Sequence, residues 1–312
     1  MRVFVTGASG FVMGHVARAL LRRGDEVVAY VRSPERARSL GEAGATLARG
    51  DLSDGSAVRA AMAGCDAAVH GAGVYEVGIA EDARSAMYEA NVVGTERVLG
   101  AALEAGLRRV VHVSTIAAFG NTRGRVVDES YRHPGAEFTS YYEETKFRAH
   151  ETALKYAAHG LPVVIVQPGQ VYGPGDHSGL GAQMRQAARG KLPVMVFPDL
   201  GLNFVHVDDA AQGVLLALDK GRVGECYVLG GQMATLRGLI DTVARVSGQP
   251  RPRLTLPMGI LRFASRIRPE LREIVSSADG VTFWAKDDKA RRELGYSPRP
   301  LAQGIAETYG RR

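Results

Sequence analysis

Short runs of β-branched residues alternate with amphipathic stretches through the first half of this chain. The first run, "RVFVTG" at residues 2–7, precedes a stretch of helical periodicity that closes at Gly24. Further runs of the same kind are "DEVVAYVR", "DAAVHGAG", "RRVVHVST" and "LPVVIVQPG". Strands that alternate with helices at this spacing are typical of parallel βαβ units. The pattern therefore predicts an α/β fold with a doubly wound parallel sheet.

The alternation loosens after about residue 168, where the chain becomes rich in glycine and proline ("QPGQVYGPGDHSGLG"). We therefore expect residues 1–167 to form a Rossmann domain, and residues 168–312 to form mainly a smaller C-terminal α/β lobe that binds substrate. Residues 202–222 are expected to return a strand and a helix to the main sheet. A long helix is also expected over about residues 81–105.

A glycine loop stands between the first strand and the first helix. Gly7 permits a tight turn, and Gly10 lets the backbone approach a pyrophosphate at the helix N-terminus. With Ser9 and Phe11, these glycines form the predicted dinucleotide-binding loop, and a plain turn between strand and helix is the alternative. Met13 stands where a third glycine usually allows close helix–strand packing, so we expect the helix to sit slightly differently.

The end of the second strand indicates which dinucleotide is bound. An acidic residue there would bind the adenosine ribose and select NAD, but the chain has Val31 and Arg32, with Arg36 one helical turn on. A guanidinium group suits a 2′-phosphate, so NADP is favoured, with NAD as the alternative. Both arginines could equally be ordinary surface residues. Asp51, in "RGDLSD", could accept a hydrogen bond from the adenine amino group.

Several motifs occur along the chain in a familiar order: T-G-x-x-G, G-D-L, "NVVGT", "HVSTIAAFG", Y-x-x-x-K, "YGPGD" and "FVHVDDAA". The set resembles the extended short-chain dehydrogenase/reductase superfamily, also called the NAD-dependent epimerase/dehydratase family, over nearly the whole chain. The closest patterns are those of dihydroflavonol-reductase-like and hopanoid-associated sugar epimerase-like members. The resemblance implies an NAD(P)-dependent enzyme.

The stretch "TSYYEETKFRAHE" contains the candidate acid–base pair. Tyr142 and Lys146 are four positions apart, so they share one face of a helix. An ammonium group favours the phenolate, so we expect Lys146 to lower the pKa of Tyr142 and to hold the nicotinamide ribose. Tyr141 has the uncharged Thr145 at the same spacing, so Tyr142 is preferred. The alternative is a buried aromatic residue beside a solvated lysine.

The resemblance assigns the remaining site residues. The catalytic hydroxyl falls on Thr115, counted back from Gly120, with Ser114 as second choice. Asn91 is expected to position Lys146, either directly or through a water. Further cofactor contacts are expected from Leu52 and Pro168, and substrate contacts from Tyr75, Tyr141 and Gln170.

Three features favour carbonyl–alcohol oxidoreduction with NADP(H). Ile116 and Ala117 stand where sugar-nucleotide dehydratases carry Asp-Glu, and neither can transfer a proton. Leu202 stands where sugar-nucleotide epimerases usually carry an arginine that binds the substrate pyrophosphate. Arg32 favours an exchangeable NADPH. An epimerase acting on a sugar or sugar nucleotide is the alternative, and a dinucleotide sensor without catalysis is a third.

Composition limits the partners. The formal charge is +6, but the arginines are scattered along helix faces without an aromatic-interleaved stripe, so no nucleic acid is expected. No apolar run reaches the ~18 residues that span a bilayer, so no membrane partner is expected. Cys65 and Cys226 are isolated, which predicts a cytoplasmic protein without a metal site. The resemblance implies a homodimer through helices near residues 85–105 and 141–159.

Overall fold

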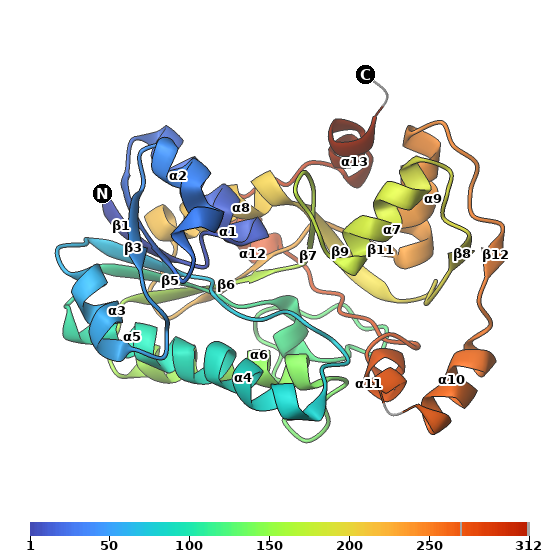
Figure 1. The fold of residues 1–312 in the computed structure, drawn as a ribbon, viewed down its shortest axis with the longest axis horizontal. Coiled ribbons are helices and arrows are strands. Elements are labelled where there is room, and N and C mark those ends of the chain that lie inside the picture. The colour runs from blue at the N-terminus through green and yellow to red at the C-terminus, as the bar shows by residue number, and fades with distance from the viewer. Residues whose placement is uncertain (269, 311–312) are drawn as a thin grey trace.

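The computed structural model describes residues 1–268 and 270–310. A seven-stranded sheet runs through the molecule, and every pair of neighbouring strands in it is parallel (Figure 1). Its strands, in spatial order, are β10 (Cys226–Leu229), β6 (Val163–Pro168), β5 (Arg109–Val113), β4 (Ala67–His70), β1 (Arg2–Thr6), β2 (Glu26–Val31) and β3 (Thr46–Arg49). The predicted doubly wound sheet is confirmed.

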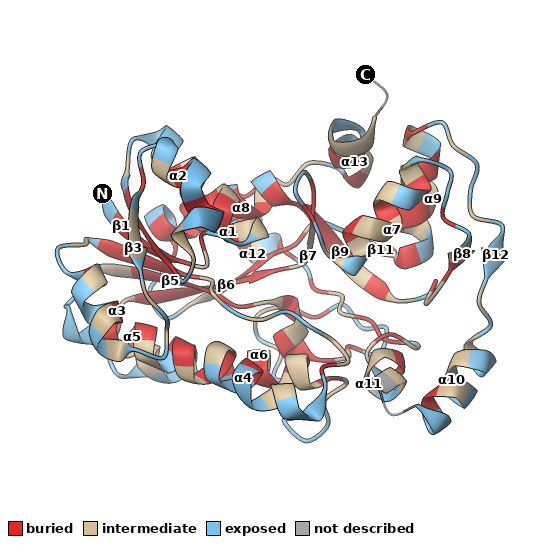
Figure 2. Ribbon diagram, viewed as in Figure 1, coloured by how far each residue is buried: buried red, intermediate tan, exposed pale blue. Residues whose placement is uncertain are grey.

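Helices cover both faces of this sheet, as the alternation predicted. One face is covered by α1 (Phe11–Arg23), α8 (Val207–Lys220) and α12 (Asp288–Leu294), and the other by α3 (Gly55–Met62), α5 (Gly94–Glu104) and α6 (Tyr141–Ala158). Because successive strand residues point to opposite faces, Val3 and Val5 of β1 pack under α1, whereas Phe4 packs on the other side. Figure 2 shows the strands buried along most of their length.

A smaller lobe follows β6. Its main sheet has the order β11 (Gln232–Thr235), β9 (Gly201–His206), β7 (Gln170–Tyr172), and a two-stranded sheet pairs β12 (Leu254–Thr255) with β8 (Val194–Met195). Phe204, Met184 and Leu239 form part of its own core. The helices of this half are α7 (Gly179–Ala188), α9 (Leu236–Val246), α10 (Met258–Ile267), α11 (Glu270–Ser276) and α13 (Leu301–Tyr309).

The helix expected over 81–105 is present as a run of helical segments with one wider turn. A 3₁₀ turn (Glu81–Ala83) leads into α4 (Arg84–Tyr88), then a π-helical turn (Glu89–Val93), then α5. Short segments elsewhere are a 3₁₀ turn (Pro34–Ala37), α2 (Arg38–Glu42) and a 3₁₀ turn (Ile116–Phe119). Within the described residues, no helix combines the length and the apolar character needed to cross a membrane.

The expectation for residues 202–222 is wrong for its strand. The helix α8 packs on the main sheet beside α1, but β9 pairs with β7 and β11 in the smaller sheet, and β10 forms the seventh strand of the main one. The chain leaves the main sheet at Gly169, where any side chain would overlap the backbone of Asn203. Because both sheets bury apolar strands, the sequence pattern of β9 did not reveal which sheet it would join.

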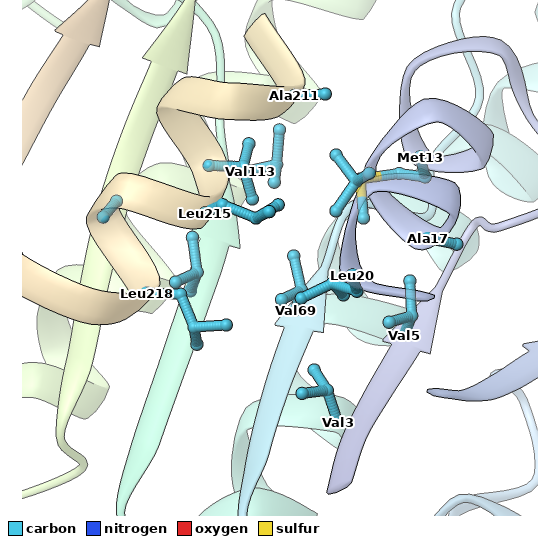
Figure 3. Packing of buried hydrophobic residues seen from close by; sticks show 14 of the residues in the cluster. Val3, Val5, Met13, Ala17, Leu20, Val69, Val113, Ala211, Leu215 and Leu218 are labelled. Atoms are coloured by element: carbon cyan, nitrogen blue, oxygen red, sulfur yellow. The ribbon is translucent and has the colours of Figure 1, made fainter. Parts of the chain in front are cut away.

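Met13 replaces the usual third glycine of the loop, and Gly71 makes room for it. Met13 is buried and points inward from α1 in Figure 3, which also labels Val69 and Val113 of the underlying sheet. A Cβ atom at Gly71, directly after β4, would overlap the Met13 thioether. The close approach that a glycine in the helix normally allows is therefore provided by a glycine after the neighbouring strand.

Replacing Gly71 by alanine will destabilise the protein, because the new methyl group competes with Met13 for space. We expect the free energy of unfolding to fall by about 1–3 kcal/mol, the usual range for an overfilled core. Met13→Ala alone removes buried side-chain volume and should cost about 2–4 kcal/mol. Urea unfolding of the double variant should show a loss about 1 kcal/mol smaller than the sum of the two. Additive losses would show that the two residues do not share space.

Candidate active site

A cleft of about 1300 Å³ opens at the carboxyl ends of the main strands. It is lined by residues that follow β1, β2, β3, β4, β5 and β6, together with residues of the smaller lobe. This is the position where open parallel sheets bind ligands, because the loops after the strands converge there. Of the residues assigned from the sequence, only Tyr141 and Asn91 are absent from the lining of this cleft.

The glycine loop forms a cradle suited to a pyrophosphate. Gly7 has a φ of +77°, a conformation that glycine adopts without strain. Gly10 precedes the first turn of α1, and neither a side-chain cap nor an acidic residue occupies that helix end. A Cβ atom on Gly10 would lie 3.1 Å from the Gly7 carbonyl oxygen. The free N–H groups and the helix dipole therefore face the cleft and fit an anionic group.

Arginines line the same end of the cleft. Arg32 and Arg36 do so as predicted, and Arg18 of α1 joins them. The Arg32 side chain is 74% exposed, and its Nε lies 4.0 Å from a carboxylate oxygen of Asp51. Asp51 accepts a hydrogen bond from Ser53 N–H at 2.8 Å, which holds the pKa of its carboxyl below the usual value. Arg18 was not assigned to the site from the sequence, and its position two turns into α1, directly after the glycine loop, was the missed signal.

Tyr142 is half-buried and lines the cleft. The hydroxyl of Thr115 is its hydrogen-bond partner, and the Tyr75 ring meets it edge-on with centroids 4.8 Å apart. Burial raises the pKa of Tyr142 well above its ordinary value, and the Thr115 hydrogen bond opposes that rise. The expected lowering by the Lys146 ammonium is not among the causes. The phenol therefore keeps its proton firmly in this state of the site.

Lys146 is half-buried as well. Its Nζ donates to the Val113 carbonyl oxygen at 3.4 Å, and burial lowers the pKa of Lys146 to about 8. Desolvation of the ammonium is the cause, since a charged amine loses hydration inside the protein. The amine therefore titrates near neutral pH at the end of β5, close to the position predicted for the nicotinamide ribose.

Asn91 contacts other groups than the one expected. In the π-helical turn, its Oδ1 accepts from Val74 N–H at 2.7 Å, and its Nδ2 donates to the Val74 carbonyl and to Thr145 Oγ1, both at 3.0 Å. It thus ties the loop after β4 to helix α6, one residue before Lys146. Asn91 has no direct hydrogen bond to Lys146 among the described contacts, and its nearest link to that residue is the bond to the preceding Thr145.

Ser114 has a partner of its own. Its hydroxyl lies 3.1 Å from Nδ1 of His150 on α6, whereas Thr115 Oγ1 accepts from Ala117 N–H at 3.2 Å and faces Tyr142. The geometry therefore favours Thr115 over Ser114 as the hydroxyl beside the phenol.

Only some of the residues expected to contact substrate line the cleft. Tyr75 and Gln170 line the cleft, as do Leu52 and Pro168 at the cofactor side. Tyr141 does not: its ring lies in a separate surface hollow with the Arg84 guanidinium 5.1 Å from the ring centroid. The two neighbouring tyrosines point in different directions because consecutive helix residues are rotated by about 100°.

Glu143 is a cleft residue that the sequence analysis missed. It is buried, hydrogen-bonded to the Thr139 hydroxyl and 3.3 Å from His133 Nε2, and burial raises its pKa to about 7. The contacts of Glu143 with Thr139 and His133 connect the loop before α6 to that helix. The smaller lobe adds further missed residues, among them the apolar Phe197, Leu200, Ile274 and Phe283 and the polar Asp176 and Ser178. These residues lie far in sequence from the recognised motifs, so the motifs did not reveal them.

Comparison with known proteins places this cleft in a family. Residues 3–230 match the family described as "NAD dependent epimerase/dehydratase family". The chain is 33% identical to a putative dihydroflavonol 4-reductase of Synechocystis sp., over 97% of this chain and 92% of the relative. It is 35% identical to 4-hydroxy-2-methyl-3-oxo-4-farnesyl-3,4-dihydroquinoline-1-oxide ketoreductase of Stigmatella aurantiaca, over 97% and 94%.

Two solved structures share the whole fold. The crystal structure of gox2253 superposes with a TM-score of 0.86 at 33% identity, covering 98% of this chain and 96% of the other. A nucleoside-diphosphate-sugar epimerase from Pseudomonas aeruginosa gives a TM-score of 0.80 at 26% identity, covering 99% and 96%. The similarity thus extends to proteins with different reactions.

The affinity for a dinucleotide will fall above about pH 8, because Lys146 loses its proton there. Below its pKa of about 8 the amine is charged in the free protein, so affinity should not vary with pH. Above it, a ligand that requires the ammonium must take up a proton, and binding weakens by up to about tenfold per pH unit.

Fluorescence titrations with NADPH and NADH at a series of pH values measure this effect. Lys146→Arg, which stays charged, should show no such dependence, and Lys146→Met should bind weakly at every pH. A decline of equal size in the arginine variant would rule out Lys146 as its source.

Proposed function

The chain belongs to the NAD-dependent epimerase/dehydratase family of extended short-chain dehydrogenases/reductases, and we propose that it is an NADP(H)-dependent oxidoreductase that reduces a carbonyl group on an apolar small molecule, or oxidises the corresponding alcohol. One observation carries the proposal. A protonated, half-buried phenol, Tyr142, stands beside the Thr115 hydroxyl in a cleft that combines an anion cradle with a largely apolar wall from the smaller lobe.

The residues of this chain would act on the carbonyl oxygen. A nicotinamide bound beside Lys146 would supply hydride to the carbonyl carbon. Thr115 donates a hydrogen bond to the oxygen on which negative charge develops, and Tyr142 transfers its proton to that oxygen. The tyrosinate that results then regains a proton from solvent. The raised pKa of Tyr142 suits an acid that must remain protonated until charge develops beside it.

The preference for NADP is proposed from the charges at the cofactor end. Three guanidinium groups, those of Arg18, Arg32 and Arg36, line that end. Asp51 also lies there, but its carboxylate already accepts a hydrogen bond from Ser53 and faces Arg32. A 2′-phosphate would find cations there, whereas NAD would leave them without an anionic partner.

The substrate class follows from the opposite end of the cleft. The lobe presents five large apolar residues beside the polar Asp176, His177 and Ser178; the apolar ones are Phe197, Leu200, Leu202, Ile274 and Phe283. The only Lys or Arg residues along the described lining are Lys146 and the three arginines of the cofactor end. A sugar nucleotide would therefore bring its pyrophosphate to a surface without a second cationic site. The name of the Stigmatella relative, a ketoreductase of a farnesylated ring, is consistent with an apolar ketone.

Sugar or sugar-nucleotide epimerisation is the second candidate. The solved Pseudomonas epimerase has the same fold at 26% identity, and an epimerase would use the same tyrosine. It would retain its dinucleotide through the cycle, so purified protein carrying tightly held NAD would favour epimerisation. A sensor would bind dinucleotide without turning over any carbonyl compound.

We also propose that two chains associate through α4, α5 and α6. Tyr88 and Leu103 on these helices are exposed apolar groups. Contact between such faces on two copies would bury them as a helix bundle.

Replacing Tyr142 by phenylalanine should abolish most of the turnover without loss of cofactor. Removal of a general acid commonly lowers kcat by about 10²–10⁴-fold, while the ring and its packing remain. Steady-state NADPH oxidation with a panel of apolar ketones, and a separate NADPH titration, measure the two effects. Tyr141→Phe is the matched control, because that ring lies outside the cleft. Equal turnover by Tyr142→Phe and wild type would refute the assignment.

Replacing Arg32 by serine should weaken NADPH and leave NADH unchanged. Loss of one charge-assisted contact to a 2′-phosphate costs about 1.5–3 kcal/mol, or about 10–100-fold in Kd. Calorimetric titrations with both dinucleotides measure the ratio. Arg22→Ser, on the exposed end of α1, controls for net charge. If the affinities for NADPH and NADH fall by the same factor, Arg32 does not bind the 2′-phosphate.

A further inference from the structure

Helix α10 presents its apolar residues to solvent. Ile260, Phe263 and Ile267 follow helical spacing on one face and are 56%, 63% and 67% exposed, whereas Ser265 is only 9% exposed. A helix on a soluble protein normally shows the opposite pattern, with its apolar stripe against the core. Figure 1 places α10 at the lower right of the molecule, at the outer edge of the smaller lobe.

The sequence segment that carries this face is basic and has no acidic residue of its own. Residues 251–268 contain five arginines and no Asp or Glu. Arg262 is held by Asp279 and Arg251 lies near Asp241. Three further arginines have no ion pair with any acidic group in the described part of the chain: Arg253, Arg266 and Arg268. An exposed apolar stripe flanked by arginine is the pattern of helices that lie in a membrane interface.

The position of α10 links this face to the cleft. α10 packs against α11, and Ile274 of α11 lines the cleft, as do Ser277 and Ala278 just after it. The exposed stripe therefore lies on the helix next to one wall of the site. A surface that is apolar and basic, beside an apolar substrate site, is suited to the boundary between lipid headgroups and acyl chains.

We propose that α10 docks this enzyme on the surface of a bilayer that contains anionic lipid. Ile260, Phe263 and Ile267 enter the boundary between headgroups and acyl chains, and Arg266 and Arg268 pair with headgroup phosphates. Docking of this kind needs no membrane-spanning segment. No membrane partner was expected from the sequence because it has no run long enough to span a bilayer, and an amphipathic surface helix contains no such run.

A second copy of the chain fits this face less well. Three side chains on a ten-residue helix offer much less than the ~800 Å² per partner of a stable protein interface. Two copies meeting there would also bring their arginine-rich stretches together, and like charges at close range repel. An anionic surface gains from the same charges instead.

Vesicle flotation of the full-length protein tests the proposal without reference to turnover. One set of vesicles is phosphatidylcholine alone, and the other adds phosphatidylglycerol. The apolar variant is Ile260→Ser/Phe263→Ser/Ile267→Ser, and the charge variant is Arg266→Glu/Arg268→Glu. The matched controls are Val223→Ser, which removes an exposed apolar residue elsewhere, and Arg59→Glu/Arg189→Glu, which makes the same charge change on α3 and just after α7.

Wild type and both controls should float with the anionic vesicles and bind phosphatidylcholine at least about tenfold more weakly. Each α10 variant should lose about tenfold or more of the anionic binding, while its NADPH affinity stays at the wild-type value. Failure of wild type to float, or equal binding by the α10 variants, would overturn the proposal. So would a dimer in analytical ultracentrifugation that the apolar variant converts to monomer, since a second copy would then cover α10.

Discussion

Seven parallel strands end at one edge of a single sheet, and this constraint assembles the whole site. In a parallel sheet every carboxyl end lies on the same side, so residues remote in sequence meet there. Six of the strands each bring one group to the cleft, namely Gly7 after β1, Arg32 after β2, Asp51 after β3, Tyr75 after β4, Thr115 after β5 and Pro168 at the end of β6. Helix α6 then supplies Tyr142 and Lys146. The anion cradle and the phenol share one cleft because the strands are parallel.

Burial, more than charge pairing, determines the chemistry of the two central groups. It raises the pKa of Tyr142 and lowers the pKa of Lys146 to about 8, because desolvation disfavours the charged form of each. The tyrosine is therefore an acid held in its protonated form, with Thr115 as its hydrogen-bond partner. This differs from the expected phenolate beside an ammonium, and it suits delivery of a proton to a carbonyl oxygen that becomes negative only during reaction.

Features that depend on local sequence patterns could be predicted from the sequence. The strand–glycine–helix order of residues 2–23 revealed the fold, and the four-residue spacing distinguished Tyr142 from Tyr141. The pairing of β9 with the smaller sheet depends on Gly169 and on contacts far along the chain, so the same apolar pattern suited either sheet. Glu143 and the apolar wall of the lobe were missed for a similar reason, since their burial arises only from tertiary packing. The compensation of Met13 by Gly71 is likewise invisible without the two elements side by side.

Transfer of isotope from labelled cofactor tests the central claim most directly. NADPH carrying deuterium at both hydrogen positions of C4 would be incubated with an apolar ketone, and the product analysed by mass spectrometry. Reduction as proposed predicts one deuterium on the carbinol carbon of each product molecule and one oxidised cofactor formed with it. An unlabelled product with no net oxidation of NADPH, together with inversion at a sugar carbon when a sugar nucleotide is supplied, would contradict the account and establish epimerisation.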